Sequence, residues 1–206
     1  EGVLAGYRGV DRDITKRLEH EALIRSLVRI HAVLSSIGNA VLRAENRDQL
    51  LQQVCQVAID QGGFQAATIC QPSADCQLSL THSAGQGSLA EYIAGFPLSH
   101  SADDPERLRR PGLAALRENR NAIVRDFATD PEVSERQRET MAGLGIGAYV
   151  ALPIGNPPWG LMALYAREPQ VFDAEELALL QRLTEEIDYG VDFLAKSERL
   201  EFLAYH

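Results

Sequence analysis

The stretch that decides the fold lies between residues 148 and 187 and reads AYVALPIGNPPWGLMALYAREPQVFDAEELALLQRLTEEI. It contains two apolar runs, AYVALPI at 148–154 and WGLMALYA at 159–166, on either side of the sequence GNPP. Apolar runs bounded by Gly, Asn and Pro predict two strands joined by a hairpin. Because both runs are long and apolar, we expect them at the centre of a sheet.

A long helix is predicted to follow this hairpin. Asp173 and Glu176 have the spacing of a capping box at its start. Apolar residues then recur along one helical face, at Leu180, Leu183, Ile187, Val191 and Leu194. The apolar pattern continues to the last residue without a Gly, Asn or Pro to end the helix, so we expect the helix to continue in a longer protein.

The chain also begins with a helical pattern. From Asp13 onward, apolar residues recur at alternating steps of four and three, at Leu23, Leu27, Ile30, Leu34, Ile37 and Val41. This is the spacing of a coiled-coil seam about three heptads long, so we expect the two end helices to pair with those of a second copy in a parallel bundle. Gly190 in the second seam and the change of phase between Leu194 and Leu200 are expected to weaken regular packing there, and they predict an adjustable joint.

Shorter elements are predicted between the two end helices. Asn46 and Gln49 have capping-box spacing for a helix that runs to about Asp60, and Ser134 and Gln137 have it for a later helix. The other predicted elements are strands at 64–70, 76–82 and 121–127 and short helices at 88–95 and 112–118. This order of elements predicts an α+β fold, in which helices pack on an antiparallel sheet.

Charge and cysteine content limit the function. The net charge is −9, from 20 Lys and Arg against 29 Asp and Glu, which argues against nucleic acid and anionic membranes as partners. No apolar run approaches the roughly 20 residues that span a bilayer. Cys55, Cys70 and Cys76 are odd in number and lack the spacing of a zinc site, so we expect free thiols in a reducing cytoplasm and no metal site. A bridge between Cys70 and Cys76 stays open, although nothing in the sequence requires it.

The carboxyl-terminal half carries a family resemblance. Residues 143–187, GLGIGAYVALPIGNPPWGLMALYAREPQVFDAEELALLQRLTEEI, are similar to the second half of GAF sensor domains: a Gly precedes one strand, ALPI ends it, a Gly begins the next strand, and FDAEELALL opens the exit helix. The resemblance covers about residues 35–195. It implies a GAF-like, PAS-related fold over 34–195, with a central antiparallel sheet of five or six strands and long terminal helices.

Both flanks carry shorter resemblances. GYRGVDRDITKR, at 6–17, resembles the closing strand of a PAS domain and its linker helix, so residues 1–33 are expected to be the end of such a domain. ERLEFLAYH, at 198–206, resembles the helix that precedes a GGDEF diguanylate cyclase domain. Residues 196–206 are therefore expected to form a signalling helix that leads to a downstream GGDEF domain.

The ligands known for the family were compared with the residues present. Attachment of a bilin implies a Cys followed by His, yet each cysteine here is followed by Gln. A cyclic-nucleotide site implies a Lys between Asn156 and Phe172, and none is present. Haem would need His31, His82 or His100 on the pocket wall, and a structural role is the commoner one for such residues. The expected cofactor is none, or an unknown small molecule.

The resemblance implies a pocket between the sheet and the variable middle segment. Its candidate wall residues are Tyr92, Phe96, Leu113, Leu116, Phe127, Met141 and Tyr149, with Arg109 and Arg110 placed to meet an anion. Aromatic and aliphatic residues at such spacings also serve as plain core, and an arginine pair is commonly solvated, so both interpretations stay open.

These observations predict a regulatory domain with no catalytic residues of its own. It binds a small ligand or relays a PAS signal to a diguanylate cyclase through a dimeric helical bundle. One alternative is a ligand-free dimerisation and spacing module. A second is an enzyme similar to the GAF branch that reduces free methionine sulfoxide with pocket cysteines.

Overall fold

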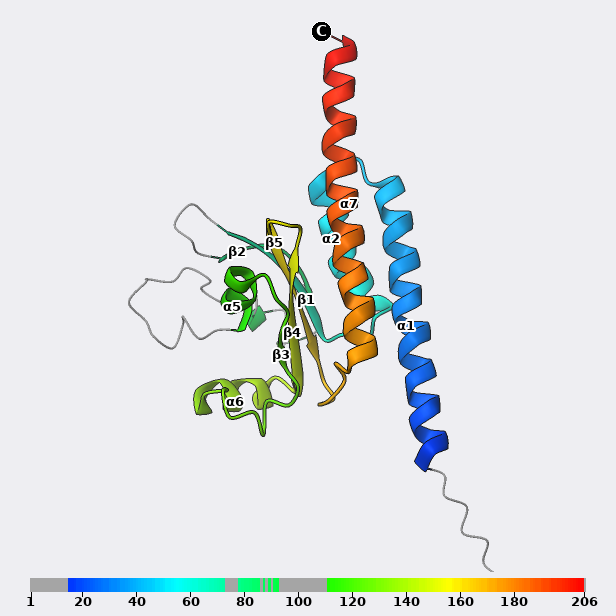
Figure 1. The fold of residues 1–206 in the computed structure, drawn as a ribbon. Helices are drawn as coiled ribbons and strands as arrows, with labels where there is room; N and C mark the ends of the chain where they lie inside the picture. The colour runs from blue at the N-terminus through cyan, green and yellow to red at the C-terminus, as the bar shows by residue number, and fades with distance from the viewer. Residues whose placement is uncertain are drawn as a thin grey trace, which may run out of the picture.

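The computed structural model describes residues 15–72, 78–85, 87, 89, 91–92 and 111–205. The helices are α1 (Thr15–Arg43), α2 (Arg47–Asp60), α5 (Pro111–Glu118), α6 (Glu135–Gly143) and α7 (Ala174–Tyr205) (Figure 1). The strands are β1 (Ala66–Pro72), β2 (Leu78–Gly85), β3 (Ala122–Val124), β4 (Ala148–Ile154) and β5 (Gly160–Ala166). Most of the short helix predicted at 88–95 lies outside the described residues.

The strands form one antiparallel sheet in the order β2-β1-β5-β4-β3. The two apolar runs that predicted the fold are β4 and β5, and β5 is the central strand. The α+β prediction, with five or six antiparallel strands, is therefore confirmed. Strand β3 ends sooner than predicted because the chain turns at Asp126, whose carboxylate accepts a hydrogen bond from the Ala128 amide at 2.9 Å.

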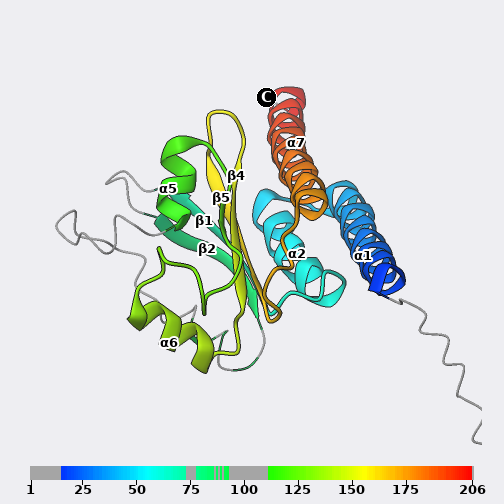
Figure 2. The ribbon, with the colours of Figure 1, turned by 60° about the horizontal axis from the view of Figure 1, so that its bottom comes forward.

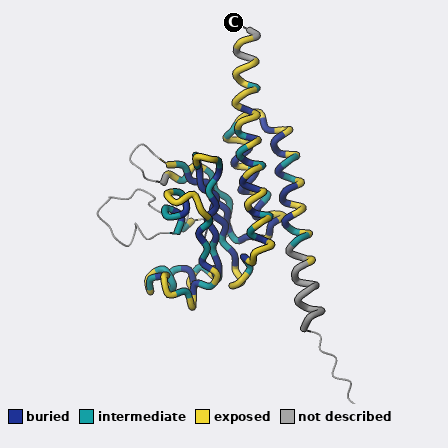
Figure 3. The backbone as a smooth tube through the Cα atoms, in the orientation of Figure 1, coloured by how far each residue is buried: buried dark blue, intermediate teal, exposed yellow. Residues whose placement is uncertain are grey.

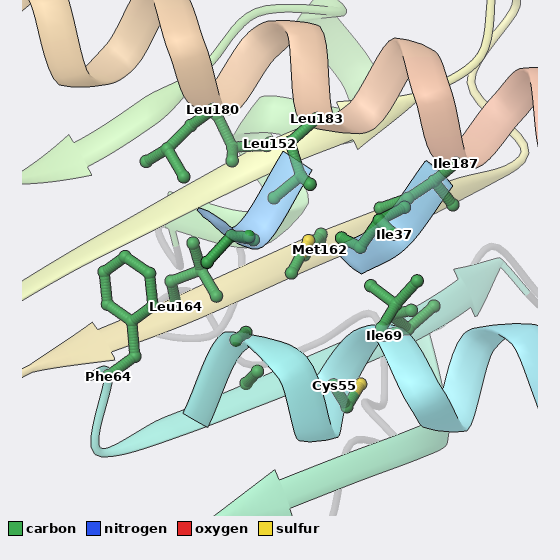
Figure 4. Close-up of a cluster of buried hydrophobic side chains, with 14 of the residues drawn as sticks. Ile37, Cys55, Phe64, Ile69, Leu152, Met162, Leu164, Leu180, Leu183 and Ile187 are labelled. Carbon is green, nitrogen blue, oxygen red and sulfur yellow. The ribbon is translucent and has the colours of Figure 1, made fainter. Parts of the chain in front are cut away.

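Helices cover both faces of the sheet (Figure 2). On one face, α2 and α7 lie directly against the strands, and α1 packs on α2 and α7 as an outer layer. The opposite face carries α5 and α6. The largest hydrophobic core lies under α2 and α7, where Leu183 and Ile187 of α7 point toward Leu152 and Met162 of the sheet (Figure 4). We call this side of the sheet the helix face.

The predicted helix starts are confirmed by their hydrogen bonds. The side chain of Asn46 accepts from the Gln49 amide at 2.9 Å at the start of α2. Ser134 and Gln137 form the reciprocal capping box of α6. At α7, an Asp173 carboxylate oxygen accepts from the Glu176 amide at 2.8 Å. Each bond satisfies a backbone donor that the helix itself leaves unpaired, and this is why these elements could be located from local sequence.

Helices α1 and α7 lie side by side and run in the same direction (Figure 1). Near the start of α7, the Arg29 guanidinium pairs with the carboxylate of Glu176, which is 2% exposed, and lies 5.2 Å from the centre of the Phe64 ring. Farther along, a Cβ built on Gly190 would lie 2.6 Å from Cγ2 of Val41. Gly190 is therefore a point of close helix packing, and not the loosely packed joint that was predicted.

The predicted seams face the core of the same chain. Of the ten residues assigned to pairing with a second copy, seven are buried: Ile30, Leu34, Ile37, Leu180, Leu183, Ile187 and Leu194. Val191 packs partly buried against the same core, Leu27 is half-buried, and the side chain of Leu23 lies outside the described part of the structure. A second copy would therefore have to use a different face of these helices.

Both long helices continue past the body of the domain, at opposite ends (Figure 1). Near the end of α7 the described side chains are exposed (Figure 3), with Leu200 at 68% and Leu203 at 66%. No helix in the described residues combines the length and the low charge needed to cross a membrane.

Candidate ligand-binding face

The sheet face opposite the helix face carries the aromatic residues of the strands. Tyr149 of β4 and Tyr165 of β5 are direct cross-strand neighbours, and their rings meet edge to face with centroids 5.1 Å apart. The ring of Phe127 lies 6.5 Å from that of Tyr149. We call this side of the sheet the tyrosine face. Aromatic side chains there combine apolar area with hydroxyl groups that can hydrogen-bond a ligand.

Most of the predicted pocket residues gather on the tyrosine face. Phe127 and Met141 are buried in one cluster, against which Tyr92 and Tyr149 pack. Leu113 and Leu116 of α5 pack against a second cluster, and Tyr149 touches both. The structure thus brings together six of the nine residues predicted to line the pocket. Phe96, Arg109 and Arg110 lie outside the described residues.

The sequence prediction missed other residues of this face, among them three large side chains and a buried threonine. Tyr165, Leu161 and Leu80 pack in the same two clusters. Thr68 of β1 is only 3% exposed, and strand alternation places it on the same side of β1 as Cys70. Side chains alternate between the two sides of a strand, so Leu161 and Tyr165 lie on the same side of β5. Both could have been predicted if the pairing of β4 with β5, which places Tyr165 beside Tyr149, had been known.

Side chains fill the space between α5 and the sheet. A Cβ built on Gly112 would lie 3.0 Å from a methyl of Leu161 and 3.1 Å from the Tyr149 hydroxyl oxygen. Glycine at this position lets the start of α5 approach the strands closely.

Two surface depressions are lined by residues other than the predicted pocket residues. One, of about 360 Å³, is lined by 125–126, 129–132 and Gln170. The other, of about 570 Å³, is a groove between α1 and α7.

The described cysteines are poor nucleophiles. Cys55 of α2 lies in the core of the helix face (Figure 4), and Cys70 lies on the tyrosine face. Burial raises the pKa of the Cys55 thiol to about 12 and the pKa of the Cys70 thiol to about 11. Because the thiolate is the reactive form, both thiols are almost wholly protonated at neutral pH. Cys76 lies outside the described residues.

The described histidines do not lie on the tyrosine face. His31 is exposed on α1 and lines the groove between α1 and α7. His82 of β2 places its Nε2 3.6 Å from a carboxylate oxygen of Asp48 on α2, and its pKa is lowered, chiefly by burial. His100 lies outside the described residues. In the part of the chain that the structure describes, no group of three His, Cys, Asp or Glu side chains could hold a metal ion.

One polar contact connects the central hairpin to α7. Trp159, at the entry to β5, donates its indole N–H to Asp188 of α7 at 2.7 Å. The guanidinium of Arg47, the first residue of α2, lies 4.5 Å from the centre of the Trp159 ring. We call these three residues the tryptophan joint. Because Trp159 is the only tryptophan in the chain, its fluorescence reports on the contact between sheet and helix.

Comparison with protein families gives one match, which spans the whole sheet, α2, α5, α6 and the first half of α7. The family model described as GAF domain matches residues 44–190. A search of curated proteins finds no match.

Solved structures share the fold at low sequence identity. The GAF domain region of a putative membrane protein from Geobacter sulfurreducens PCA is 21% identical, with a TM-score of 0.59, covering 77% of this chain and 99% of that chain. The phycoerythrobilin-bound GAF domain from a cyanobacterial phytochrome is 16% identical, with a TM-score of 0.60, covering 82% and 97%.

The same fold occurs in an enzyme. The free methionine-R-sulfoxide reductase from Neisseria meningitidis, solved with its substrate, is 13% identical, with a TM-score of 0.62, covering 82% of this chain and 91% of that chain. At these identities the likeness establishes the fold alone.

Proposed function

The chain belongs to the GAF domain family, a regulatory sensor fold of signalling proteins, and from this premise we propose that it relays a signal to a downstream diguanylate cyclase. The signal is a small ligand on the tyrosine face or a change in an upstream PAS domain. The domain itself performs no chemistry and works in the cytoplasm. A dimeric helical bundle carries the message, and cyclic di-GMP is made by the output domain.

The observation that carries this proposal is the continuity of α7. Its first half packs against β4 and its last turns extend beyond the body as one uninterrupted helix (Figure 1). A helix is stiff along its axis, so a small rotation or shift imposed at the sheet reaches the far end of α7. This arrangement suits a relay, because one continuous helix connects the sheet to the far end of α7.

Two contacts supply the inputs to α7. The tryptophan joint connects it to the β4–β5 turn, whose strands also carry Tyr149 and Tyr165 on the opposite face. The pair of Arg29 and Glu176 connects it to α1. A ligand that displaced the two tyrosines would thus act on α7 through β4 and β5, and an upstream domain would act on it through α1.

The relay is tested by changing the phase of α7. The chain is fused after His206 to a diguanylate cyclase domain, and helix-forming inserts of one to seven residues are placed after Glu198. A relay predicts that cyclic di-GMP synthesis varies with the insert and recovers when a whole heptad of seven residues is added. A seven-residue Gly-Ser insert is the matched control and should uncouple the output. A rate of cyclic di-GMP synthesis that does not depend on the length of the helical insert would contradict the relay.

A ligand-free spacing module is the second candidate, favoured by the close packing of α5 on the sheet at Gly112. Native mass spectrometry of gently purified protein and thermal shift against a metabolite panel separate the two. A bound molecule, or a ligand-dependent rise in melting temperature, supports the sensor because a ligand that binds the folded state stabilises it. A quenching or shift of Trp159 fluorescence on binding would show that the ligand acts on the tryptophan joint.

The reductase alternative has the shared fold in its favour and the raised pKa values of Cys55 and Cys70 against it. Its test is turnover of free methionine sulfoxide by the wild type and by a variant that lacks all three cysteines. Turnover that is lost in the variant would establish the enzyme in place of the sensor.

A further inference from the structure

The loop between β3 and α6, at residues 125–134, touches both the tyrosine face and the chain that leads into α7. We call it the β3–α6 loop. Its Phe127 is buried and places its ring 6.5 Å from the ring of Tyr149. Its first residue, Arg125, is hydrogen-bonded to the segment 170–172, directly before α7. The loop and the start of α7 lie at the same end of the sheet (Figure 1).

Arg125 holds this segment through two hydrogen bonds. Its backbone carbonyl accepts from the Gln170 amide at 2.7 Å, and its guanidinium donates to the carbonyl of Phe172. We call these three residues the arginine clasp. Gln170 has a φ of 60°, a left-handed backbone conformation that is unfavourable for a residue with a side chain. The arginine clasp therefore holds a strained turn directly before α7.

The arginine clasp fixes the point at which α7 begins. The first backbone bond of the helix runs from the Leu177 amide to the Asp173 carbonyl at 3.0 Å, so the carbonyl of Phe172 lies outside the helical ladder. Phe172 is fully buried, and a buried carbonyl needs a donor, which Arg125 supplies. The Phe172 ring is held as well, because it stacks on Phe64. A movement of Arg125 therefore acts on the first turn of α7.

Hydrogen bonds within the β3–α6 loop restrict its internal motion. The guanidinium of Arg138, on α6, donates to the backbone carbonyls of Phe127 and Asp130 at 3.1 Å each. The carboxylate of Asp126 accepts from an amide and a hydroxyl of the next three residues, at 2.9 Å each. Because Asp126 lies between Arg125 and Phe127, these bonds leave the two residues little freedom to move independently. A displacement of the Phe127 ring is thus passed to Arg125.

We propose that Arg125 is a positioning residue that couples the tyrosine face to the start of α7. A ligand that displaces the Phe127 ring moves the β3–α6 loop, and the arginine clasp passes this movement to the first turn of α7. The purpose of the coupling rests on the proposed function, whereas the coupling itself is a property of this domain alone.

This route differs from the one through β4, β5 and the tryptophan joint in the place where it reaches α7. The tryptophan joint contacts Asp188, in the middle of the helix, whereas the arginine clasp precedes the capping residue Asp173. Glu176, in the same first turn, pairs with Arg29 of α1. A signal from the tyrosine face and a signal from α1 would therefore act on the same turn of α7.

The coupling is tested by hydrogen exchange of the whole chain, with Phe127→Leu as the probe that stands in for a displaced ring. We expect this variant to speed exchange of the amides at 177–183 of α7 by about tenfold. The amides at 51–58 of α2 report any general loss of stability and should change much less. Equal changes in the two helices would overturn the proposal, because the probe would then act on the whole fold and not on α7.

The role of Arg125 is tested by repeating the measurement in an Arg125→Met background, where Phe127→Leu should change exchange at 177–183 by about twofold or less. Arg136, which is exposed on α6 and outside the clasp, gives the matched control Arg136→Met, in which the tenfold effect should persist. A purely structural arginine would add its own effect to that of the probe without altering it. A probe effect that is undiminished by Arg125→Met therefore overturns the proposal.

Arg125→Lys provides a second background, which keeps a cation but replaces the guanidinium by a single ammonium group. The probe effect there should be intermediate, and it decides the question if circular dichroism shows that Arg125→Met does not fold. Coupling that is absent while the cyclase fusion still responds to helical inserts would overturn this inference alone. Coupling that is present in a chain whose fusion ignores the inserts would overturn only the proposed function.

Discussion

The two faces of the sheet are built from the same strands but are closed in different ways. The helix face has one continuous aliphatic core under α1, α2 and α7. The tyrosine face has two smaller clusters, joined by the half-buried Tyr149, and it contains the buried hydroxyl of Thr68. The two faces therefore differ in what they bury. The helix face buries one large aliphatic core, and the tyrosine face buries smaller clusters beside hydroxyl groups.

The most direct test of the difference between the two faces is to remove one phenylalanine side chain from each. Phe172 is fully buried on the helix face and stacks on Phe64 with ring centroids 6.1 Å apart, whereas Phe127 is 8% exposed on the tyrosine face. We expect Phe172→Ala to lower the free energy of unfolding by about 3–5 kcal/mol, and Phe127→Ala to lower it by less. Urea denaturation measures both. Equal losses would show that the two faces contribute alike.

The polar contact at the rim of the helix face gives the next largest effect. Arg29→Met would leave the buried carboxylate of Glu176 without its guanidinium, and we expect a loss of about 3 kcal/mol. The double variant Arg29→Met/Glu176→Gln removes both charges and should recover part of that loss. A double-mutant cycle by urea denaturation checks this, and a zero coupling energy would mean that the pair does not fasten α1 to α7.

Close packing on the helix face is tested at Gly190. A methyl group there would lie 2.6 Å from Val41 and 3.0 Å from Leu50, so we expect Gly190→Ala to destabilise by about 1–3 kcal/mol. Gly143, the last residue of α6 on the other side of the sheet, has open space where a Cβ would stand, with no atom within 4 Å. Gly143→Ala is the matched control, and its melting temperature should stay the same or rise slightly.

The smallest expected change in the free energy of unfolding comes from the two described thiols, of which Cys55 lies on the helix face and Cys70 on the tyrosine face. Burial raises the pKa of Cys55 to about 12 and of Cys70 to about 11, above the value of an unfolded thiol. Their protonated forms therefore stabilise the fold below about pH 9, and this contribution is lost as the pH rises toward the folded pKa values. Between pH 8 and pH 9.5 we expect a loss of about 1 kcal/mol or less for each thiol.

Urea denaturation of the wild type, Cys55→Ala and Cys70→Ala at the two pH values measures this loss. Each replacement should remove part of the slope with pH. Alkylation of native protein should be slow for both thiols and faster for Cys70, whose pKa is nearer to neutral. Faster alkylation of Cys55 than of Cys70 would contradict the expectation that Cys55 is the less reactive thiol.

Local sequence predicted the elements well and the partners of the long helices poorly. The strands β4 and β5 and three helix starts follow from signals that operate within a few residues, such as Asn46 with Gln49. The four-and-three spacing of Ile30, Leu34 and Ile37 shows that α1 has a face to bury, but it does not say which chain buries it. Here the chain's own α2 and α7 do so, since α1 packs on both.

The candidate site was predicted in part for a similar reason. Tyr149 and Phe127 were found because the family resemblance indicates a pocket on one side of the sheet. Tyr165 was missed because its partnership with Tyr149 depends on the antiparallel register of β4 and β5, which is a property of the pairing and not of either strand alone. The tryptophan joint was missed too, because it connects residues 47, 159 and 188 through tertiary structure.

The shared direction of α1 and α7 has a consequence for protein architecture. The chain travels along α1, builds the sheet, returns to the starting side and travels the same way again along α7. A module attached ahead of Thr15 and one attached beyond Tyr205 would therefore sit on opposite poles. Domains with this pair of parallel helices can therefore follow one another along a common axis, each one adding to the length of the protein.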